Sequence, residues 1–263
     1  MAAAYDAFLK GWSHFLDSTP DGYAKAIPYF EEAIRLDPNY GRPYAALALV
    51  YSPPSWVWAT WEQKLNLSTH QLSEKGYAYL NEARKRPTSL SYQASGVFQF
   101  QEGAFMAAYD DFQQAIVLDP SDPWSYADMA NVLIFDGRPK EAIQFIRTAM
   151  RIDPSYPPQY AYILGLAEFG MANFEAAANS FEDATKRNSS FDEAFLLLAA
   201  TYGQMGRKQE AAAAIAGYNS LIARQGRPSA TVASATFYRD HFIEASDWDR
   251  LSQGLQLAGM PAY

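Results

Sequence analysis

The fold of this chain is decided by residues 118–154, which read LDPSDPWSYADMANVLIFDGRPKEAIQFIRTAMRIDP. The stretch begins and ends with an apolar residue followed by Asp-Pro, and Pro120 and Pro154 lie 34 positions apart. Between them, apolar residues recur at spacings of three and four on both sides of Asp136-Gly137-Arg138. They are Tyr126, Met129 and Leu133 before this turn and Ala142, Ile146 and Ala149 after it. This spacing places each set on one face of a helix, so the stretch predicts a helical hairpin.

Local signals mark both ends of this hairpin. Asp122 can accept hydrogen bonds from the free N–H groups of the first helix. Pro123 suits the first helical position, because the donor it lacks is not needed there. Pro154 cannot continue the second helix and disfavours a helical conformation at Asp153. We therefore expect the helices to begin near residue 123 and to end near residue 152.

The same pattern recurs along the chain. It can be aligned on Pro38, on Pro120, and over residues 158–191 and 192–224, and a weaker copy with residues 52–67 inserted begins at Gly41. Gly11, Gly96 and Gly165 occupy a small-residue position where two helices approach closely. One hairpin cannot bury its apolar side alone, so neighbouring hairpins stack. The sequence predicts an all-α, right-handed superhelical solenoid of about six hairpins.

The repeat pattern stops after Arg224, so we expect the array at residues 1–224 and capping helices at residues 225–263. The first capping helix should begin at Ser229 and run to about Phe242. The second should begin at Asp247, bury a stripe of Trp248, Leu251 and Leu255, and stop at Gly259. These helices would cover the apolar face of the last hairpin, which has no following neighbour.

Composition excludes several classes of function. Lys and Arg number 21 against 29 Asp and Glu, which gives a net charge of −8 and disfavours nucleic acid as a partner. The chain has no Cys, so disulfides, thiolate metal sites and a thiol nucleophile are excluded. Neither a secretory signal nor an apolar run long enough to span a membrane is present, and we expect a cytoplasmic protein.

The repeated positions resemble tetratricopeptide repeats. Residues 5–11, 19–22 and 26–40, together with the ending at residues 254–261, are similar to an array found in many bacterial class III adenylate/guanylate cyclases and in related regulators. That array forms the C-terminal half of those proteins. The resemblance implies a signalling or scaffolding role without chemistry of its own, since the cyclase pattern of strands and paired Asp residues is absent.

In such a solenoid the first helix of each hairpin lines the concave face. The residues expected to face inward form a largely aromatic groove: Tyr5, Phe8, Trp12, Phe15, Gln93, Phe100, Trp124, Asn131, Phe135, Tyr162 and Phe169. An apolar helix or extended segment of a partner could bury these rings, each contributing about 1.5–3 kcal/mol. Alternatively, superhelical curvature or the C-terminal helices already bury them. A clamp for a peptide carboxylate is disfavoured, since Gln93, Ala127 and Tyr162 replace the Lys residues it needs.

The insertion at residues 52–67 carries Trp56, Trp58 and Trp61. Trp58, Trp61 and Leu65 share a helical stripe, which could pack over the edge of the second and third hairpins or form a docking surface for a partner. The partner could be a cyclase or regulator domain.

The sequence favours a non-catalytic protein-binding module over two alternatives. One is the regulatory half of a nucleotide cyclase. The other is a homo-oligomer formed through the first hairpin. His14, His70 and His241 fall in different units, and acidic pairs lie on polar faces or caps, so we expect no metal, no cofactor and no catalytic residue.

Overall fold

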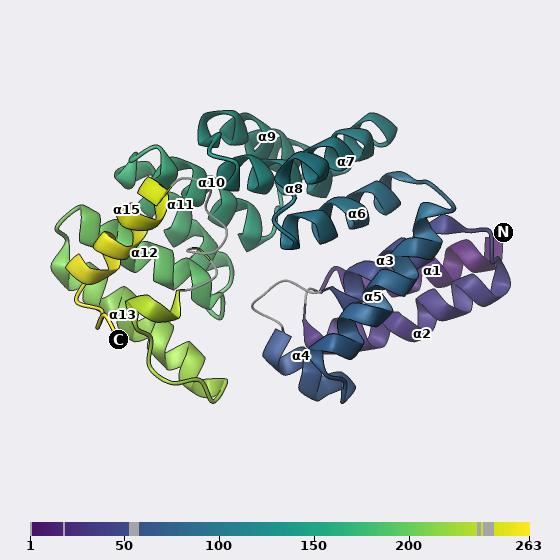
Figure 1. The fold of residues 1–263 in the computed structure, drawn as a ribbon, viewed down its shortest axis with the longest axis horizontal. Helices are drawn as coiled ribbons and strands as arrows, with labels where there is room; N and C mark the ends of the chain where they lie inside the picture. The colour runs from purple at the N-terminus through teal and green to yellow at the C-terminus, as the bar shows by residue number, and fades with distance from the viewer. Residues whose placement is uncertain (1, 18, 53–57, 236–237, 239–244) are drawn as a thin grey trace. The chain divides into compact units, whose positions relative to one another are not determined.

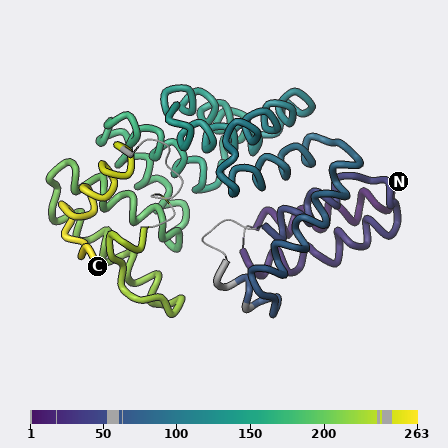
Figure 2. The backbone as a smooth tube through the Cα atoms, in the orientation of Figure 1, coloured from purple at the N-terminus to yellow at the C-terminus, as the bar shows by residue number. Residues whose placement is uncertain are grey.

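A computed structural model describes residues 2–17, 19–52, 58–235, 238 and 245–263 (Figure 1). Within them every regular element is a helix, as the tube in Figure 2 also shows. This confirms the predicted all-α helical-repeat fold. The chain divides into two compact units, residues 1–120 and 121–263, which are described separately below.

Unit 1 contains three helical hairpins and one additional short helix. The hairpins pair α1 with α2, α3 with α5, and α6 with α7. The helices span Ala2–Phe15 (α1), Pro20–Leu36 (α2), Gly41–Tyr51 (α3), Trp58–Leu65 (α4), Thr69–Arg84 (α5), Ser89–Gln101 (α6) and Phe105–Leu118 (α7).

Unit 2 contains three further hairpins and the C-terminal elements. The hairpins pair α8 with α9, α10 with α11, and α12 with α13. The helices span Pro123–Phe135 (α8), Pro139–Ile152 (α9), Pro158–Gly170 (α10), Phe174–Arg187 (α11), Asp192–Gln204 (α12), Lys208–Arg224 (α13) and Ala245–Leu257 (α15), and a 3-10 turn, η2, covers Val232–Ser234. The described residues therefore hold the six predicted hairpins.

The hairpin on which the sequence analysis rests forms as expected. The Asp122 carboxylate accepts hydrogen bonds from the backbone N–H groups of Trp124 and Ser125, at 3.3 and 3.1 Å. Gly137 turns the chain between α8 and α9 with φ of 74°, a conformation in which a side chain would be strained. Cap and turn chemistry therefore set the bounds of both helices.

Close packing of the paired helices depends on glycine. A Cβ atom on Gly11 would lie 2.7 Å from the Phe30 ring, and one on Gly165 would lie 2.6 Å from the Phe181 ring. Gly96 meets the ring of Phe112 in the same way, at 2.8 Å. These phenylalanines are buried, so the glycine-to-ring contact sets how closely the helices approach.

The insertion forms the short helix α4, which packs on α2 and α5. The Trp61 side chain is fully buried, with its ring 5.7 Å from the Tyr23 ring of α2. The stripe was expected to cover the second and third hairpins; α4 instead contacts the first hairpin through α2 and the second through α5, and Trp61 meets Tyr23 of the first. Trp56 and the side chain of Trp58 lie outside the described residues.

The first predicted capping helix does not begin at Ser229. The Thr231 backbone is extended, and η2 follows it. The backbone N–H groups of Val232 and Ala233 donate hydrogen bonds to the carbonyls of Pro261 and Ala262. A chain held by these distant partners cannot make local helical bonds at the same positions. The predicted end at Phe242 lies outside the described residues.

The second capping helix is present as α15, which begins two residues before the predicted Asp247. It packs along α12 and fully buries Leu251 and Leu255 (Figure 1). The two helices cross at Gly203 and Gly254, where a Cβ on Gly203 would lie 2.0 Å from the Gly254 carbonyl oxygen. α15 thus packs on the first helix of the α12–α13 hairpin.

No helix among the described residues has both the length and the apolar character needed to cross a membrane.

Candidate partner-binding surface

Four large apolar side chains follow one face of α1 and the residue after it. Tyr5, Leu9, Trp12 and Leu16, which we call the α1 stripe, are spaced by four, three and four positions and so lie on one side of the helix. Tyr5 is 54% exposed, Leu9 44% and Leu16 49%, and Trp12 is half-buried. Apolar side chains gathered in this way are typical of a surface that a partner covers.

A series of aromatic rings packs against Trp12 of the α1 stripe. Trp12 stacks on Phe8 at 5.6 Å and on Phe15 at 4.9 Å between ring centroids. Phe15 contacts Tyr23 at 5.2 Å, and Tyr23 contacts Trp61. Each such pair adds about 0.5–1.5 kcal/mol beyond the burial of its area. Trp12 is therefore held in a fixed position beside the exposed residues.

Phe8 does not face a partner, contrary to expectation. Its side chain is 1% exposed. The Tyr40 ring lies 5.5 Å away, and the Arg42 guanidinium lies 5.1 Å from the centre of the Phe8 ring. These two residues precede and begin α3, so the second hairpin covers this position of the first. Its role is packing.

The predicted residues of α6 divide between core and surface. Gln93 is buried, with 7% of its area exposed, so it lies in the core. Phe100 remains half-buried near the end of α6 and lies 5.6 Å from the Phe105 ring. Only Phe100 retains accessible surface for a partner.

The predicted residues of α8 divide in the same way. Trp124 and Asn131 are half-buried, and Trp124 meets the fully buried Tyr160 ring edge to face at 5.2 Å. Phe135 is 2% exposed and belongs to the core. The expectation that Phe135 lines an open groove is wrong, because it lies at the end of α8, where the chain turns into α9.

On α10 neither predicted residue is freely accessible. Phe169 is 3% exposed and contacts Phe174 at 5.5 Å. Tyr162 is half-buried as a residue, but burial of its hydroxyl, reinforced by the charge of Glu193, raises the pKa of Tyr162 well above its ordinary value. This hydroxyl is hydrogen-bonded to the hydroxyl of Tyr238. The chain itself therefore covers part of the predicted groove.

The sequence analysis did not identify three residues that belong to the α1 stripe or contact a predicted groove residue. Leu9 and Leu16 belong to the α1 stripe, and their helical spacing from Tyr5 was a signal that could have found them. Tyr238 carried no such signal, because it reaches Tyr162 across 76 positions of sequence. Contacts at that separation follow from the tertiary fold alone.

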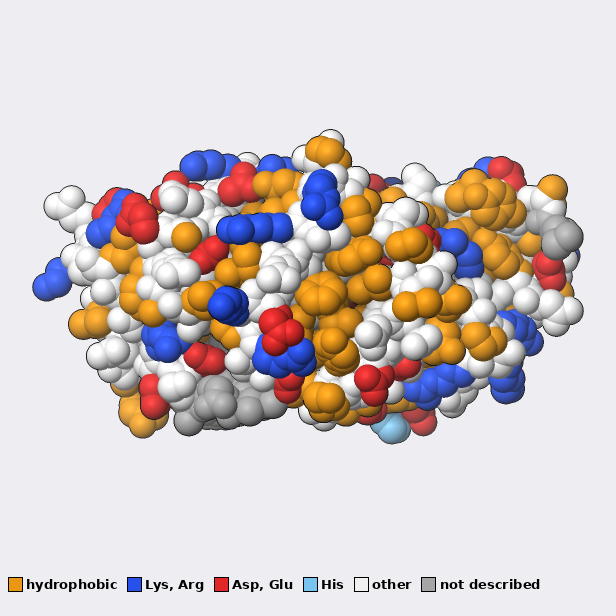
Figure 3. Space-filling view, turned by 90° about the horizontal axis from the view of Figure 1, so that it is seen from above, with side chains coloured by type: hydrophobic (Ala, Val, Ile, Leu, Met, Phe, Trp, Pro, Cys, Tyr) orange, Lys and Arg blue, Asp and Glu red, His pale blue; other side chains and the backbone are white. Residues whose placement is uncertain are grey.

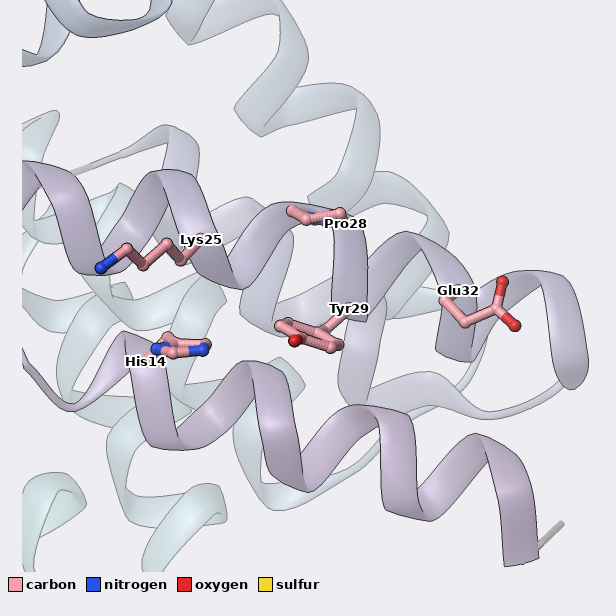
Figure 4. A pocket seen from close by; sticks show the side chains of 5 residues that line it. All are labelled: His14, Lys25, Pro28, Tyr29 and Glu32. Atoms are coloured by element: carbon pink, nitrogen blue, oxygen red, sulfur yellow. The ribbon is translucent and has the colours of Figure 1, made fainter.

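An open depression lies between α1 and α2 on the His14 side of unit 1 (Figure 4). Its volume is about 560 Å³, and it is lined by His14, Lys25, Pro28, Tyr29 and Glu32. The His14 and Tyr29 rings stack at 5.6 Å. Hydrogen bonds from the Arg35 guanidinium to the exposed Glu32 carboxylate lower the pKa of Glu32. These groups are engaged in local surface pairs.

The shifted pKa values of two carboxyl groups in unit 2 are explained by burial and by contacts within the fold. The Tyr202 hydroxyl donates to Glu182 at 2.7 Å and lowers the pKa of that carboxyl, aided by Lys186. Burial raises the pKa of Asp192, and Arg227, 3.2 Å away, opposes the shift. No group of three or more His, Cys, Asp or Glu side chains in the described part of the chain could hold a metal ion.

Acidic and basic side chains are interspersed with apolar ones on the face shown in Figure 3. Most of the described ion pairs join residues three or four positions apart on exposed helix surfaces, such as Arg35 with Glu32. Pairs of this kind add little to stability.

Two family models described as tetratricopeptide repeat match the chain, one at residues 99–167 and the other at residues 23–40. A relative from Dictyostelium discoideum, a DnaJ homolog subfamily C member 7 homolog, is 31% identical over 113 residues, which are 41% of this chain. The chain spans about a fifth of the length of that curated relative, 21% of it.

Three solved structures share the fold. The Cut9–Hcn1 hetero-tetramer of the APC/C has a TM-score of 0.63 at 13% identity, covering 96% of this chain and 46% of that one. PilF from Pseudomonas aeruginosa has a TM-score of 0.54 at 14% identity, covering 85% and 98%. MamA from Desulfovibrio magneticus RS-1, from residue 41 onward, has a TM-score of 0.51 at 17% identity, covering 69% and 98%. At these identities the likeness concerns the fold alone.

Proposed function

We propose that this chain, which carries tetratricopeptide repeats, is a non-catalytic protein-binding module. Tetratricopeptide-repeat proteins generally mediate contacts between proteins, and helical-repeat arrays provide extended surfaces for such contacts. The binding segment of the partner is an apolar helix or extended stretch that buries the accessible aromatic residues of the first helices.

One observation carries the proposal: the α1 stripe places three large side chains, each at least 44% exposed, beside a Trp that is fixed by ring stacking. Burial of one such side chain by a partner contributes about 1.5–3 kcal/mol. Tyr and Trp also lose little conformational entropy on binding, which makes them effective anchors.

The test replaces exposed residues, which leaves the core intact. The double variant Tyr5→Ser/Leu9→Ser should reduce the recovery of specific partners from cells that make the protein. The matched control is Met106→Ser/Val117→Ser, which removes two side chains of α7 that are 62% and 68% exposed. Equal recovery with both variants, at unchanged melting temperature, would remove the α1 stripe from the proposal.

The α1 stripe is also compatible with self-association, the second candidate. It lies on the first hairpin, and the same four side chains could pack against their copies in another chain. Light scattering at several concentrations tests this directly. A mass that rises with concentration for the wild type but not for Tyr5→Ser/Leu9→Ser would favour a homo-oligomer.

A role as the regulatory half of a nucleotide cyclase is the finer proposal. It is supported by the resemblance of residues 5–11, 19–22, 26–40 and 254–261 to that group. The genomic sequence on either side of this coding region tests it. A flanking domain with a different chemistry, or none, would end the proposal while leaving protein binding in place.

A further inference from the structure

A basic side chain, Arg42, lies beside the α1 stripe. Its guanidinium is 5.1 Å from the centre of the Phe8 ring, and Phe8 stacks on Trp12. Tyr5, Phe8 and Trp12 are spaced by three and four positions and so share one face of α1. Phe8 is the buried middle residue of this set. Arg42 therefore covers the position between the exposed Tyr5 and the half-buried Trp12.

The electrostatic environment of Tyr40 also places the guanidinium near the start of the stripe. Burial raises the pKa of Tyr40, the charge of Arg42 opposes this shift, and the charge of an ionised Tyr5 reinforces it. The Tyr40 ring itself packs on Phe8 at 5.5 Å. The Tyr40 hydroxyl thus lies near both Arg42 and Tyr5, so all three belong to one part of the surface.

Arg42 lacks a carboxylate partner within the chain. Its Nε–H is buried without a hydrogen-bond acceptor, and none of the described residues forms an ion pair with its guanidinium. Two other cations of unit 1 are paired: Lys10 Nζ lies 3.0 Å from Asp6 Oδ2, and Arg86 Nη1 lies 3.1 Å from Glu82 Oε2. The charge of Arg42 is therefore available to a carboxylate from outside the chain.

The position of Arg42 in α3 is unfavourable for a cation. It is the second residue of this helix, where the positive end of the helix dipole disfavours a basic side chain. Tyr40, the N-cap residue, makes no side-chain hydrogen bond to the first turn of α3. A carboxylate placed here would be attracted by the guanidinium and by the helix end together. The charge of Arg42 thus favours an anionic ligand rather than the stability of α3.

We propose that the partner segment bound by the α1 stripe carries a carboxylate among its apolar residues, and that Arg42 pairs with this Asp or Glu side chain. This inference rests on the proposed protein-binding function and adds the chemistry of the partner. Arg holds a carboxylate through two parallel N–H···O bonds, so Arg42 also fixes the register of the segment on the stripe. The stripe supplies the burial, and Arg42 supplies the choice of sequence.

The experiment selects binders of the full chain from a phage-displayed library of random peptides with the length of α1. The wild type should enrich peptides that combine aromatic or aliphatic residues with an Asp or Glu at a fixed position. Arg42→Gln should enrich apolar peptides without this acidic preference. The matched control is Arg35→Gln, which changes the net charge equally but removes an exposed cation of α2 that is paired with Glu32. It should keep the acidic preference.

Affinity measurements with the best wild-type peptide quantify the pair. Replacing its selected Asp or Glu by the corresponding amide should weaken binding to the wild type about five- to tenfold and leave binding to Arg42→Gln unchanged. Arg42→Lys keeps the charge without the two-bond geometry, so the amide peptide should lose less affinity there. Should Arg42→Gln melt well below the wild type, Arg42→Met, which retains apolar cover over Phe8, replaces it, and the same loss of preference is then required.

The proposal is overturned if the wild-type peptides show no acidic preference, or if Arg42→Gln shows the same preference as the wild type. Apolar peptides that bind the wild type but not Tyr5→Ser/Leu9→Ser would still uphold the proposed function in either case. If no peptide is enriched, or if the enriched peptides bind Tyr5→Ser/Leu9→Ser as well as the wild type, the α1 stripe itself fails as the binding surface, and this inference fails with it. The two failures are therefore distinguishable.

Discussion

The contact between a glycine and a phenylalanine sets the spacing within a hairpin. In three hairpins the glycine of the first helix leaves room for the ring of the second, and the available space is less than one methyl group requires. Gly11 and Phe30 lie three residues further apart in the sequence than Gly96 and Phe112 or Gly165 and Phe181. The longer connection between α1 and α2 accounts for the difference. Sequence spacing could predict these pairs because both partners lie within one repeat.

Replacing Gly165 tests this contact. Gly165→Ala should lower the free energy of unfolding by about 1–3 kcal/mol, because its Cβ would be forced against the Phe181 ring. In a Phe181→Leu background the ring is gone, and the same change should be neutral or stabilising, since Ala favours a helix by about 1 kcal/mol over Gly. Denaturant unfolding of the four chains measures the coupling.

Gly103 provides the control for this cycle. It has open space around it but a φ of 76°, so Gly103→Ala should cost about 1 kcal/mol through backbone strain. That cost should be the same with Phe or Leu at position 181. An equal cost of Gly165→Ala in both backgrounds would show that the ring contact is not the cause.

Phe135 and Trp124 distinguish packing from binding on α8. Phe135→Ala should lower the free energy of unfolding by about 3–5 kcal/mol, because the side chain is almost fully buried. Trp124→Ala should cost clearly less, because part of that ring is accessible. Chemical denaturation measures both. Equal losses would mean that Trp124 is as much a core residue as Phe135 and has no free surface to offer.

The sequence predicted the helix for each candidate groove residue but not its exposure. Phe8, Phe135 and Phe169 lie on the expected helices, yet each is covered by side chains from a neighbouring element. Residues such as Tyr40 and Arg42 reach Phe8 because of the angle between hairpins, which a spacing template does not contain.

At the scale of elements, the C-terminal helix shows what a hydrophobic stripe can predict. Leu251 and Leu255 indicated a helix with one apolar face, and α15 uses that face to cover α12. The close crossing at Gly203 and Gly254 was not predictable, because the two glycines come from different elements. The start at Ser229 failed for a related reason, since distant carbonyls satisfy the N–H groups that a local helix would use.

Blocking this crossing should detach α15. A Cβ at Gly254 would lie 2.5 Å from the Ala200 carbonyl oxygen, a backbone atom that cannot move aside. Gly254→Val should therefore expose Leu251 and Leu255, increase protease cleavage C-terminal to residue 244, and lower the melting temperature. Limited proteolysis followed by mass spectrometry measures the cleavage.

Leu257→Ser is the matched control, since this residue of α15 is 51% exposed. It should leave both the cleavage pattern and the melting temperature unchanged. If Gly254→Val resisted the protease as well as the wild type does, the packing of α15 on α12 would not depend on the close approach at Gly254.

At the scale of the whole molecule, stability depends on burial of apolar and aromatic side chains. The chain carries a net charge of −8, and the ion pairs that its charged side chains form are mostly short-range and exposed, each worth less than about 1 kcal/mol. Many of the 18 tyrosines, by contrast, have buried rings and buried or bonded hydroxyls. This makes tyrosine ionisation the main link between pH and folding above neutrality.

That link predicts how the protein unfolds in alkali. Burial raises the pKa of Tyr51 to about 12, and burial with a hydrogen bond to Glu182 raises the pKa of Tyr202 to about 12, against an ordinary value of 10.0. The folded chain thus holds protons that the unfolded chain releases, so the free energy of unfolding is maintained below pH 10 and falls as the pH rises from 10 towards 12. As the pH rises, phenolate absorbance should stay below that of free tyrosine at first, and then rise together with the loss of helical circular dichroism.

Tyr202→Phe removes one such group and should flatten the decline of the free energy of unfolding by up to about 1.4 kcal/mol per pH unit, although the lost hydrogen bond lowers stability at neutral pH. An unchanged slope for Tyr202→Phe would mean that this hydroxyl ionises equally in the folded and unfolded chains.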